Sequence, residues 1–426
     1  MERIELTNYR CFKKLDISFK KRVNLFIGDN SSGKTTIIRA VRHILSSFFT
    51  GYSDENTRFN SLSKADFTLK ETKNGIINEA PIKISFEIFG RTSHLILNSP
   101  KGRTLQLPLL PILHYGKELK ETLFNEAFSQ TKPLPLFASF STEDIHSTRK
   151  LSMTPFKQYI HKPSFGYYEC LQGDGFFYYW IKRLLVLKEG GKGDIELYCV
   201  RQAIINALGC EGCNIIVDFE IRPNQGKVYY YFSDGREVIA ENLSDGYTRL
   251  VNIVTDLAFR CALLNQGIYG EEACLKTSGT VLIDEIDLHL HPNLQSIVLT
   301  GLQNAFPNLQ FIVTTHAPMI MTGIKTDEES MIFKLSYSKD KDYNVHPIEL
   351  YGMDASSIIQ VALDTIPRSR VVDNELNSLF EAIDHDRYIE ANLMISQMRE
   401  RNRDSLPELI KAESMMDFLN SSNDKD

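Results

Sequence analysis

The sequence has no paired cysteine pattern and no long apolar run, and each absence argues against a class of protein. Its seven cysteines are scattered and odd in number, which argues against a disulfide framework and for free thiols in a reducing compartment. No stretch approaches the roughly 18 uninterrupted apolar residues of a membrane span. The opening residues lack the apolar segment of a secretory signal. We therefore expect a cytoplasmic protein without a membrane partner.

The sequence also lacks a strong charge of one sign. Its net charge of -6 gives no overall attraction to nucleic acid or to a membrane surface, so any contact with DNA needs a local basic patch. One candidate patch lies within 146–162, and a solvated surface is the commoner outcome for such a stretch. Its basic residues are His146, Arg149, Lys150, Lys157, His161 and Lys162.

What the sequence does contain is a glycine-rich loop of the form G-x-x-x-x-G-K-T between an apolar run, Val23–Ile27, and an amphipathic helical pattern. Backbone N–H groups and a helix N-terminus converge in such a loop and favour a bound phosphate. Lys34 is expected to reach the β and γ phosphates, and the Thr35 hydroxyl to hold Mg²⁺. The residues expected at the nucleotide are Gly28, Asn30, Ser31, Ser32, Gly33, Lys34, Thr35 and Thr36.

Later in the chain, polar residues stand at the ends of apolar elements. Asp284-Glu285 follows an apolar strand pattern, where an acid can bind Mg²⁺ and a second can orient water. Leu-Ser-Asp-Gly at 243–246 opens an amphipathic helix, where free N–H groups favour phosphate. His316 follows another buried strand pattern and could bind a γ-phosphate. Taken singly, each has a structural alternative: a capping acid pair, an ordinary serine N-cap and a structural histidine.

Read in order, these motifs resemble the ATP-binding cassette class, and within it the RecF and SMC-related ATPases. The opening stretch 4–12 and the segments 284–292 and 314–318 are similar to theirs. The resemblance implies an α/β fold: a P-loop head with a mixed sheet and flanking helices. It also implies that two heads dimerise around two ATP molecules, each with Mg²⁺.

The resemblance assigns roles within one head. Thr35 and Asp284 are the expected Mg²⁺ ligands. Glu285 is the expected catalytic acid that activates water, and His316 is the switch histidine.

It also assigns contacts between heads. Ser244 and Gly246 are expected to touch the γ-phosphate of ATP held by the other subunit, and Asp287 to lie across the dimer. Asp245 stands where transporters usually carry Gly, as is common in the RecF-like group. Arg10 is expected near the adenine.

Four segments are expected along the chain. An N-terminal lobe of the head over 1–98 and a C-terminal lobe over 211–352 enclose a compact insertion over 99–210. The pattern over 99–175 is punctuated by prolines and favours irregular structure, and the aromatic cluster that follows it is interpreted as helix core. A helical extension over 353–426 carries three amphipathic stripes.

This extension resembles the helical tail of the ATPase subunit of Septu-type anti-phage systems, which works with a separate HNH nuclease. We therefore expect an ATP-hydrolysing subunit that forms a homodimer or a higher homo-oligomer and regulates an HNH nuclease. The alternatives are a RecF-like repair ATPase that acts directly on DNA and, third, a transporter cassette.

Overall fold

The computed structural model divides into two compact units, residues 1–358 and 359–426, which are described separately. The residues that it describes are 1–72, 75–123, 130–141, 162–173, 176–191, 193–338, 342–402 and 406–423. The basic stretch 146–162 lies outside them except for Lys162, which forms an ion pair with Glu55.

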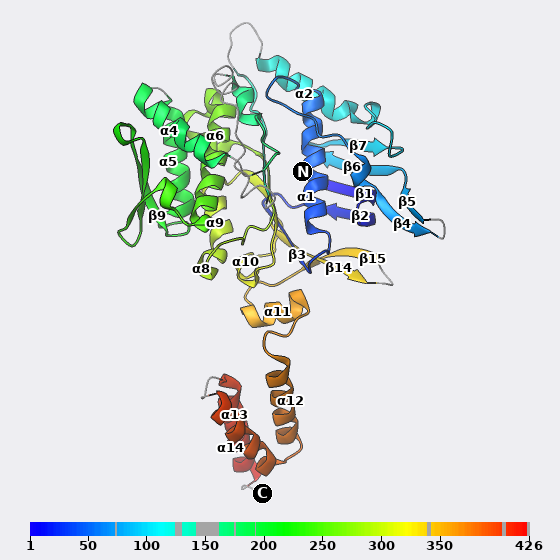
Figure 1. The fold of residues 1–426 in the computed structure, drawn as a ribbon, viewed down its shortest axis with the longest axis vertical. Helices are drawn as coiled ribbons and strands as arrows, with labels where there is room; N and C mark the ends of the chain where they lie inside the picture. The colour runs from blue at the N-terminus through cyan, green and yellow to red at the C-terminus, as the bar shows by residue number, and fades with distance from the viewer. Residues whose placement is uncertain are drawn as a thin grey trace. The chain divides into compact units, whose positions relative to one another are not determined.

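The first unit combines strands and helices (Figure 1). Its strands are β1 (Arg3–Tyr9), β2 (Phe12–Ser18), β3 (Val23–Gly28), β4 (Thr68–Thr72), β5 (Gly75–Glu79), β6 (Ile82–Ile88), β7 (Arg91–Leu97), β8 (Leu136–Phe140), β9 (Ile216–Arg222), β10 (Lys227–Phe232), β11 (Glu237–Ile239), β12 (Gly279–Ile283), β13 (Leu309–Thr314), β14 (Met331–Ser338) and β15 (Asp342–Ile348). Its helices are α1 (Lys34–Ser47), α2 (Leu110–Leu123), α4 (Phe177–Gly190), α5 (Asp194–Leu208), α6 (Asp245–Tyr269), α7 (Ala273–Lys276), α8 (Pro292–Gln295), α9 (Val298–Ala305) and α10 (Pro318–Thr322). The division between the two units falls within α11 (Ala355–Leu363), after Ile358.

The core of this unit is a sheet with the order β15-β14-β3-β13-β12-β8. All neighbours pair in parallel except β15, so the expected mixed sheet is confirmed. Every residue of β3 and β13 is buried, as a parallel sheet covered on both faces requires. Figure 1 shows α1 on one side of the sheet and α5, α6 and α9 on the other. The carboxyl ends of β3, β12 and β13 therefore meet at one edge.

A second sheet, β2-β1-β6-β7, is antiparallel and starts with the β1–β2 hairpin. In β6 the apolar side chains alternate with polar ones, and Ile82, Ile84, Phe86 and Ile88 are buried. This alternation is typical of a sheet with one covered face. The hairpin feeds β3 directly and so delivers the turn between β1 and β2 to the glycine-rich loop.

The expectation of irregular structure over 99–175 was wrong for α2 and β8. β8 is completely buried and pairs in parallel with β12, so a strand of the core sheet lies inside the stretch expected to be an insertion. Pro135 precedes β8, a position where a proline removes no ladder hydrogen bond. The apolar run of β8 is too short to show a period, and only its pairing with β12 identifies it as a strand.

The aromatic cluster on α4 belongs to the core, as its sequence pattern indicated. Trp180 stacks on Phe259 of α6 with ring centroids 4.6 Å apart, and its Nε1 donates to Asp256 Oδ1 at 2.8 Å. Tyr178 is the exposed member of the cluster. The cluster therefore fixes α4 against α6.

The second unit consists of α12 (Arg370–Asp384), α13 (Tyr388–Asn402) and α14 (Pro407–Asn423), whose apolar stripes bury one another. This confirms the three expected stripes. Ion pairs join α13 to α14 through Arg399 and Glu413, and α13 to α12 through Arg401 and Glu375. Within the described part of the chain, no helix has the length and apolarity to cross a membrane.

We predict that the second unit depends on its buried stripe and not on its exposed apolar side chains. Leu379→Ala removes a fully buried side chain and should destabilise this unit by about 2–5 kcal/mol. Leu393→Ala, at a position 60% exposed, should change its stability by less than about 0.5 kcal/mol. Amide hydrogen exchange across α12 to α14 in the full chain measures both, and equal effects would contradict the packing.

Candidate nucleotide-binding site

The loop between β3 and α1 adopts a backbone that its glycines make possible. Gly28 and Gly33 have φ of 140° and 101°, and Ser31 lies between them with φ of 67°. A Cβ on Gly28 would lie 2.3 Å from the Leu335 carbonyl oxygen, and one on Gly33 would lie 2.5 Å from Phe12 Cζ. Both glycines therefore supply conformation and space that a larger residue cannot.

Lys34 begins α1 and is buried at the loop. Its Nζ donates to the carbonyl oxygens of Gly28 and Asp29, each at 2.8 Å. Burial lowers the pKa of Lys34 to about 8, although the nearby carboxylates, above all Asp284, favour its charged form. The loop thus holds a cation whose protonation changes near physiological pH.

Oxygen atoms converge at the carboxyl end of β12. The buried Asp284 accepts a hydrogen bond at Oδ1 from Thr314 Oγ1 at 2.5 Å, and this Oδ1 lies 3.4 Å from Thr35 Oγ1. A carboxylate and a hydroxyl at this spacing are oxygen ligands of the kind that Mg²⁺ prefers. The residues expected to hold Mg²⁺ therefore lie together and fit the ion, and Thr314, which we did not predict, orients the carboxylate.

Glu285 lies next to Asp284 in a left-handed conformation, with φ of 49°. Its backbone N–H donates to Thr314 Oγ1 at 2.8 Å. Arg249 of α6 donates from Nη1 to the Glu285 carbonyl oxygen at 2.6 Å and from Nη2 to that of Asp284 at 2.7 Å. The acid pair is thus held from β13 and from α6. Neither anchor was predicted, because each contact joins residues that are distant in the sequence.

Asp287 lies in the segment after β12 and His316 in the segment after β13, and the two segments meet at the same edge of the sheet. Thr315 Oγ1 donates to Asp287 Oδ1 at 2.5 Å and accepts from the Ala317 N–H at 3.0 Å. Burial, followed by the Lys34 cation, lowers the pKa of the half-buried His316, while Asp287 and the acid pair act in the opposite direction. A neutral imidazole can donate one hydrogen bond and accept another.

Ser244 is the N-cap of α6 and is exposed, and its side chain makes no capping hydrogen bond. This is not the hydrogen-bonded serine cap that was the structural alternative. Among the described residues, no hydrogen bond joins Ser244 to loop 28–36 of the same chain. Gly246 is buried, and a Cβ there would lie 2.3 Å from the His289 carbonyl oxygen. The first turn of α6 therefore packs on the loop that follows the acid pair.

Arg10 lies in the β1–β2 turn with φ of 52°, and its guanidinium binds Asp66 Oδ1 through Nε and Nη2 at 2.9 and 2.7 Å. The turn contacts the loop, because Cys11 Sγ lies 3.8 Å from Thr36 Oγ1. Arg10 is therefore near the loop but paired with an acid that the sequence did not single out. Its contact with adenine stays a prediction.

Three further residues that were expected at the nucleotide are Asn30, Ser31 and Ser32. Asn30 and Ser31 are exposed, and Ser32 is buried beside Lys34, with its Oγ 3.5 Å from Nζ. At the same edge of the sheet, Ser141 follows β8 beside Asp284, whose N–H donates to the Phe140 carbonyl oxygen at 2.9 Å.

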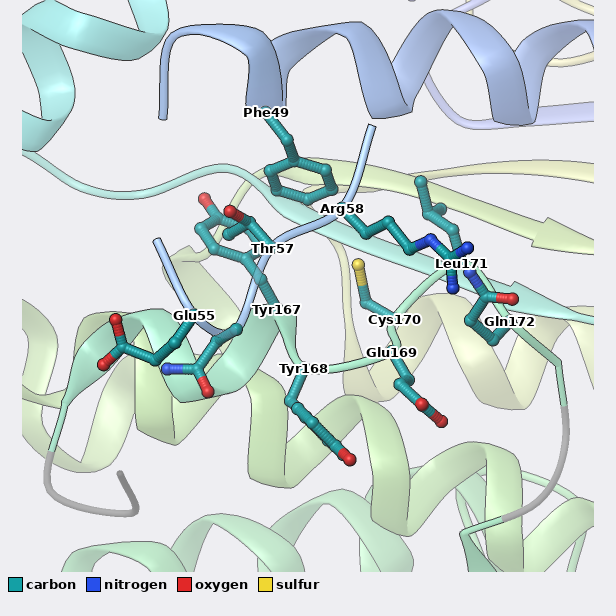
Figure 2. A pocket seen from close by; sticks show the side chains of 11 residues that line it. Phe49, Glu55, Thr57, Arg58, Tyr167, Tyr168, Glu169, Cys170, Leu171 and Gln172 are labelled. Atoms are coloured by element: carbon teal, nitrogen blue, oxygen red, sulfur yellow. The ribbon is translucent and has the colours of Figure 1, made fainter. Parts of the chain in front are cut away.

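A separate cavity of about 210 Å³ lies past the other end of α1 (Figure 2). Arg58 reaches across it toward Gln172, and Phe49 closes one side. No residue of the expected site lines it; its lining residues are Phe49, Glu55, Asn56, Thr57, Arg58, Tyr167, Tyr168, Glu169, Cys170, Leu171 and Gln172. In the described residues, no group of three His, Cys, Asp or Glu side chains is arranged to hold a metal.

We predict that α6 tolerates a side chain at one of its glycines and not at the other. Gly246→Ala places a methyl group against the His289 carbonyl and should destabilise the protein by roughly 1–3 kcal/mol. Gly267→Ala, in the same helix with its nearest neighbour 3.4 Å away, should be neutral or stabilise by up to about 1 kcal/mol. Thermal unfolding compares the two, and a neutral Gly246→Ala would contradict the close approach.

Comparison with known proteins gives the chain its relatives. A family model described as "AAA domain, putative AbiEii toxin, Type IV TA system" matches residues 23–322. The retron Ec83 probable ATPase of Escherichia coli is 25% identical over 386 residues, which cover 74% of this chain and 68% of that protein. The Septu protein PtuA of Bacillus mycoides (strain KBAB4) is 24% identical over 396 residues, which cover 89% of this chain and 46% of that protein.

Among solved structures, the SMC head domain from Thermotoga maritima aligns with 82% of this chain and 98% of its own, with a TM-score of 0.43 and 13% identity. The matched part spans between 27% and 80% of the length of the retron and Septu relatives. The family match includes loop 28–36, the start of α6, the acid pair and His316. The expected P-loop ATPase identity is thereby confirmed, and the chain belongs to this AAA-domain ATPase family.

Proposed function

We propose that the chain binds ATP with Mg²⁺ between two copies of itself, hydrolyses it, and uses the closed state to regulate a nuclease partner in anti-phage defence. The observation that carries the ATP site is the meeting of the Thr35 and Thr314 hydroxyls at Asp284, beside the buried Lys34. The Septu relative and the resemblance of the helical tail support the defence role.

Each residue of the site has a separate role in ATP binding or hydrolysis. Lys34 and the N–H groups of the loop bind the phosphates. Glu285 takes a proton from water as the water oxygen bonds to the γ-phosphorus and the bond from that phosphorus to ADP breaks. His316 hydrogen-bonds a γ-phosphate oxygen. Thr35 and Asp284 would hold Mg²⁺, which would supply neutralisation of the phosphate charge.

The second copy supplies the contact that one copy leaves open. Ser244 is exposed, its hydroxyl does not cap α6, and it makes no hydrogen bond to the loop of its own chain within the described residues. Ser244 and Gly246 of one copy would bind the γ-phosphate held by Lys34 of the other, with Asp287 in contact across the dimer. ATP thus links the two copies through its terminal phosphate.

We predict that ATP affinity falls as the pH rises through 8. Burial lowers the pKa of Lys34 to about 8, and phosphate favours the charged ammonium, so binding above this pH must take up a proton. Affinity should fall by up to about tenfold per pH unit above the shifted pKa. Calorimetry at pH 8.5 in two buffers of different ionisation enthalpy measures the proton uptake.

Lys34→Arg is the control, because a guanidinium stays charged throughout this range. The variant should bind ATP without proton uptake at pH 8.5, whatever its absolute affinity. Equal proton uptake by the wild type and Lys34→Arg would assign the titration to another group and contradict the prediction.

A further prediction concerns the closed dimer. Glu285→Gln keeps the size of the side chain but cannot accept the proton, so hydrolysis should fall by about 10²–10⁴-fold while ATP stays bound. Size-exclusion chromatography with light scattering should then show an ATP-dependent dimer. Adding Ser244→Arg to this variant should prevent the dimer and leave one ATP bound per chain. If Glu285→Gln neither retains ATP nor changes association, the assignment of the site fails.

The partner is tested by purifying native complexes. Recovery of an HNH nuclease with the chain supports the proposed regulation. Recovery of DNA without a nuclease supports the alternative of a RecF-like ATPase that acts directly on DNA.

A further inference from the structure

Helix α6 touches the acidic loop that follows β12 at two points. Its first turn lies against the His289 carbonyl, where only the lack of a side chain on Gly246 permits the approach. In its next turn, Arg249 reaches the carbonyl oxygens of Asp284 and Glu285. The helix that begins at Ser244 is therefore fastened within one chain to both ends of the segment that carries the catalytic acid.

Arg249 is buried between α6 and the loop that follows β12. Its residue is 5% exposed, and its two bonds of 2.6 and 2.7 Å have the short length of charge-assisted hydrogen bonds. Both hydrogen bonds come from one planar guanidinium, through Nη1 and Nη2. The orientation of the Asp284–Glu285 backbone is therefore tied to the orientation of this group. A lysine has one ammonium and cannot reproduce this geometry.

The backbone of Glu285 needs such support. A φ of 49° is disfavoured for a residue with a side chain and persists only where the surroundings hold it. Thr314 binds the N–H of this residue, and Arg249 binds its carbonyl oxygen. Thr314 belongs to a strand of the core sheet, whereas α6 begins at the exposed Ser244. Arg249 is therefore the contact that connects Glu285 to the exposed start of this helix.

We propose that Arg249 is a positioning residue that couples the Ser244 end of α6 to Glu285. When Ser244 binds the phosphate held by the other copy, a shift of the rigid helix moves the Arg249 guanidinium and sets the Glu285 backbone for attack by water. Hydrolysis then waits for dimer closure. The inference rests on the proposed function and adds the residue that makes the two sites of the dimer interdependent.

The same helix provides a matched control. Arg260 is also buried, and it donates from Nε to Asp256 Oδ2 and from Nη1 to the Gly166 carbonyl at 2.6 and 2.7 Å. These contacts face the core around α4 and do not touch the acidic loop. Arg249→Lys and Arg260→Lys therefore remove the same fork from the same helix at comparable burial, and only the first should act on the chemistry.

The kinetic test compares the two variants with the wild type. Arg249→Lys should keep ATP affinity within about threefold and lower the hydrolysis rate by about 10–100-fold, because a small misplacement of a reacting group has an effect of this size. Arg260→Lys should lower thermal stability and should not lower the hydrolysis rate relative to ATP affinity in this way. In the Glu285→Gln background, Arg249→Lys should cause no further loss of rate, since residues that act as a unit are not additive. A full additional loss would overturn the proposal.

A structural test does not depend on hydrolysis. Amide hydrogen exchange of residues 284–291 in the nucleotide-free protein should rise about tenfold or more in Arg249→Lys and stay unchanged in Arg260→Lys. Unchanged exchange in Arg249→Lys would overturn the proposed positioning of Glu285 by Arg249, even if ATP hydrolysis is confirmed. Absence of ATP binding by the wild type would instead overturn the proposed function, and the coupling with it, even if the exchange result holds.

Should Arg249→Lys fail to fold, the Glu285→Gln variant tests the coupling with Arg249 intact. ATP should then protect residues 245–252 and 284–291 together, and adding Ser244→Arg should abolish both protections while ATP remains bound. Protection of 284–291 that survives Ser244→Arg would overturn the proposal, because the acidic loop would respond to its own ATP and not to the helix.

Discussion

The candidate site depends on one constraint, the parallel alignment of β3, β13 and β12. This register places Thr314 opposite Phe26, and Ile283 opposite Val313, so the residue after β12 emerges beside the end of β13. Asp284 is buried there, and a buried carboxylate needs hydrogen-bond partners. Thr314 and Thr35 supply hydroxyls from β13 and α1. A slip of one residue in β12 or β13 would turn Asp284 or Thr314 to the other face of the sheet.

The candidate site also combines three acidic residues with the cations of Lys34 and Arg249. Asp284, Glu285 and Asp287 favour the charged form of Lys34, whereas burial lowers its pKa to about 8. The two threonines at the end of β13 bind the first and last of these acids, Thr314 on Asp284 and Thr315 on Asp287. Arg249 adds a cation from α6 on the backbone side. The middle acid, Glu285, is partly exposed.

The sequence predicts those parts of the molecule whose signal is local. The loop from Gly28 to Thr35, the acid pair and the stripes of α12 to α14 each show a spacing that one element explains. β8 could not be predicted, because its short run acquires meaning only beside β12. The role of Arg249 could not be predicted for a related reason. In the sequence it is one more charge on an amphipathic helix, and its partners are backbone carbonyl oxygens distant in the chain.

The central claim, that ATP is held between two copies of this chain, is tested most directly by a crystal structure with Mg²⁺ and a non-cleavable ATP analogue. The account predicts a dimer in which Ser244 of one copy lies within hydrogen-bond distance of the γ-phosphate bound by Lys34 of the other. An analogue bound at Lys34 with Ser244 far from every phosphate, together with solution scattering of a monomer, would contradict it.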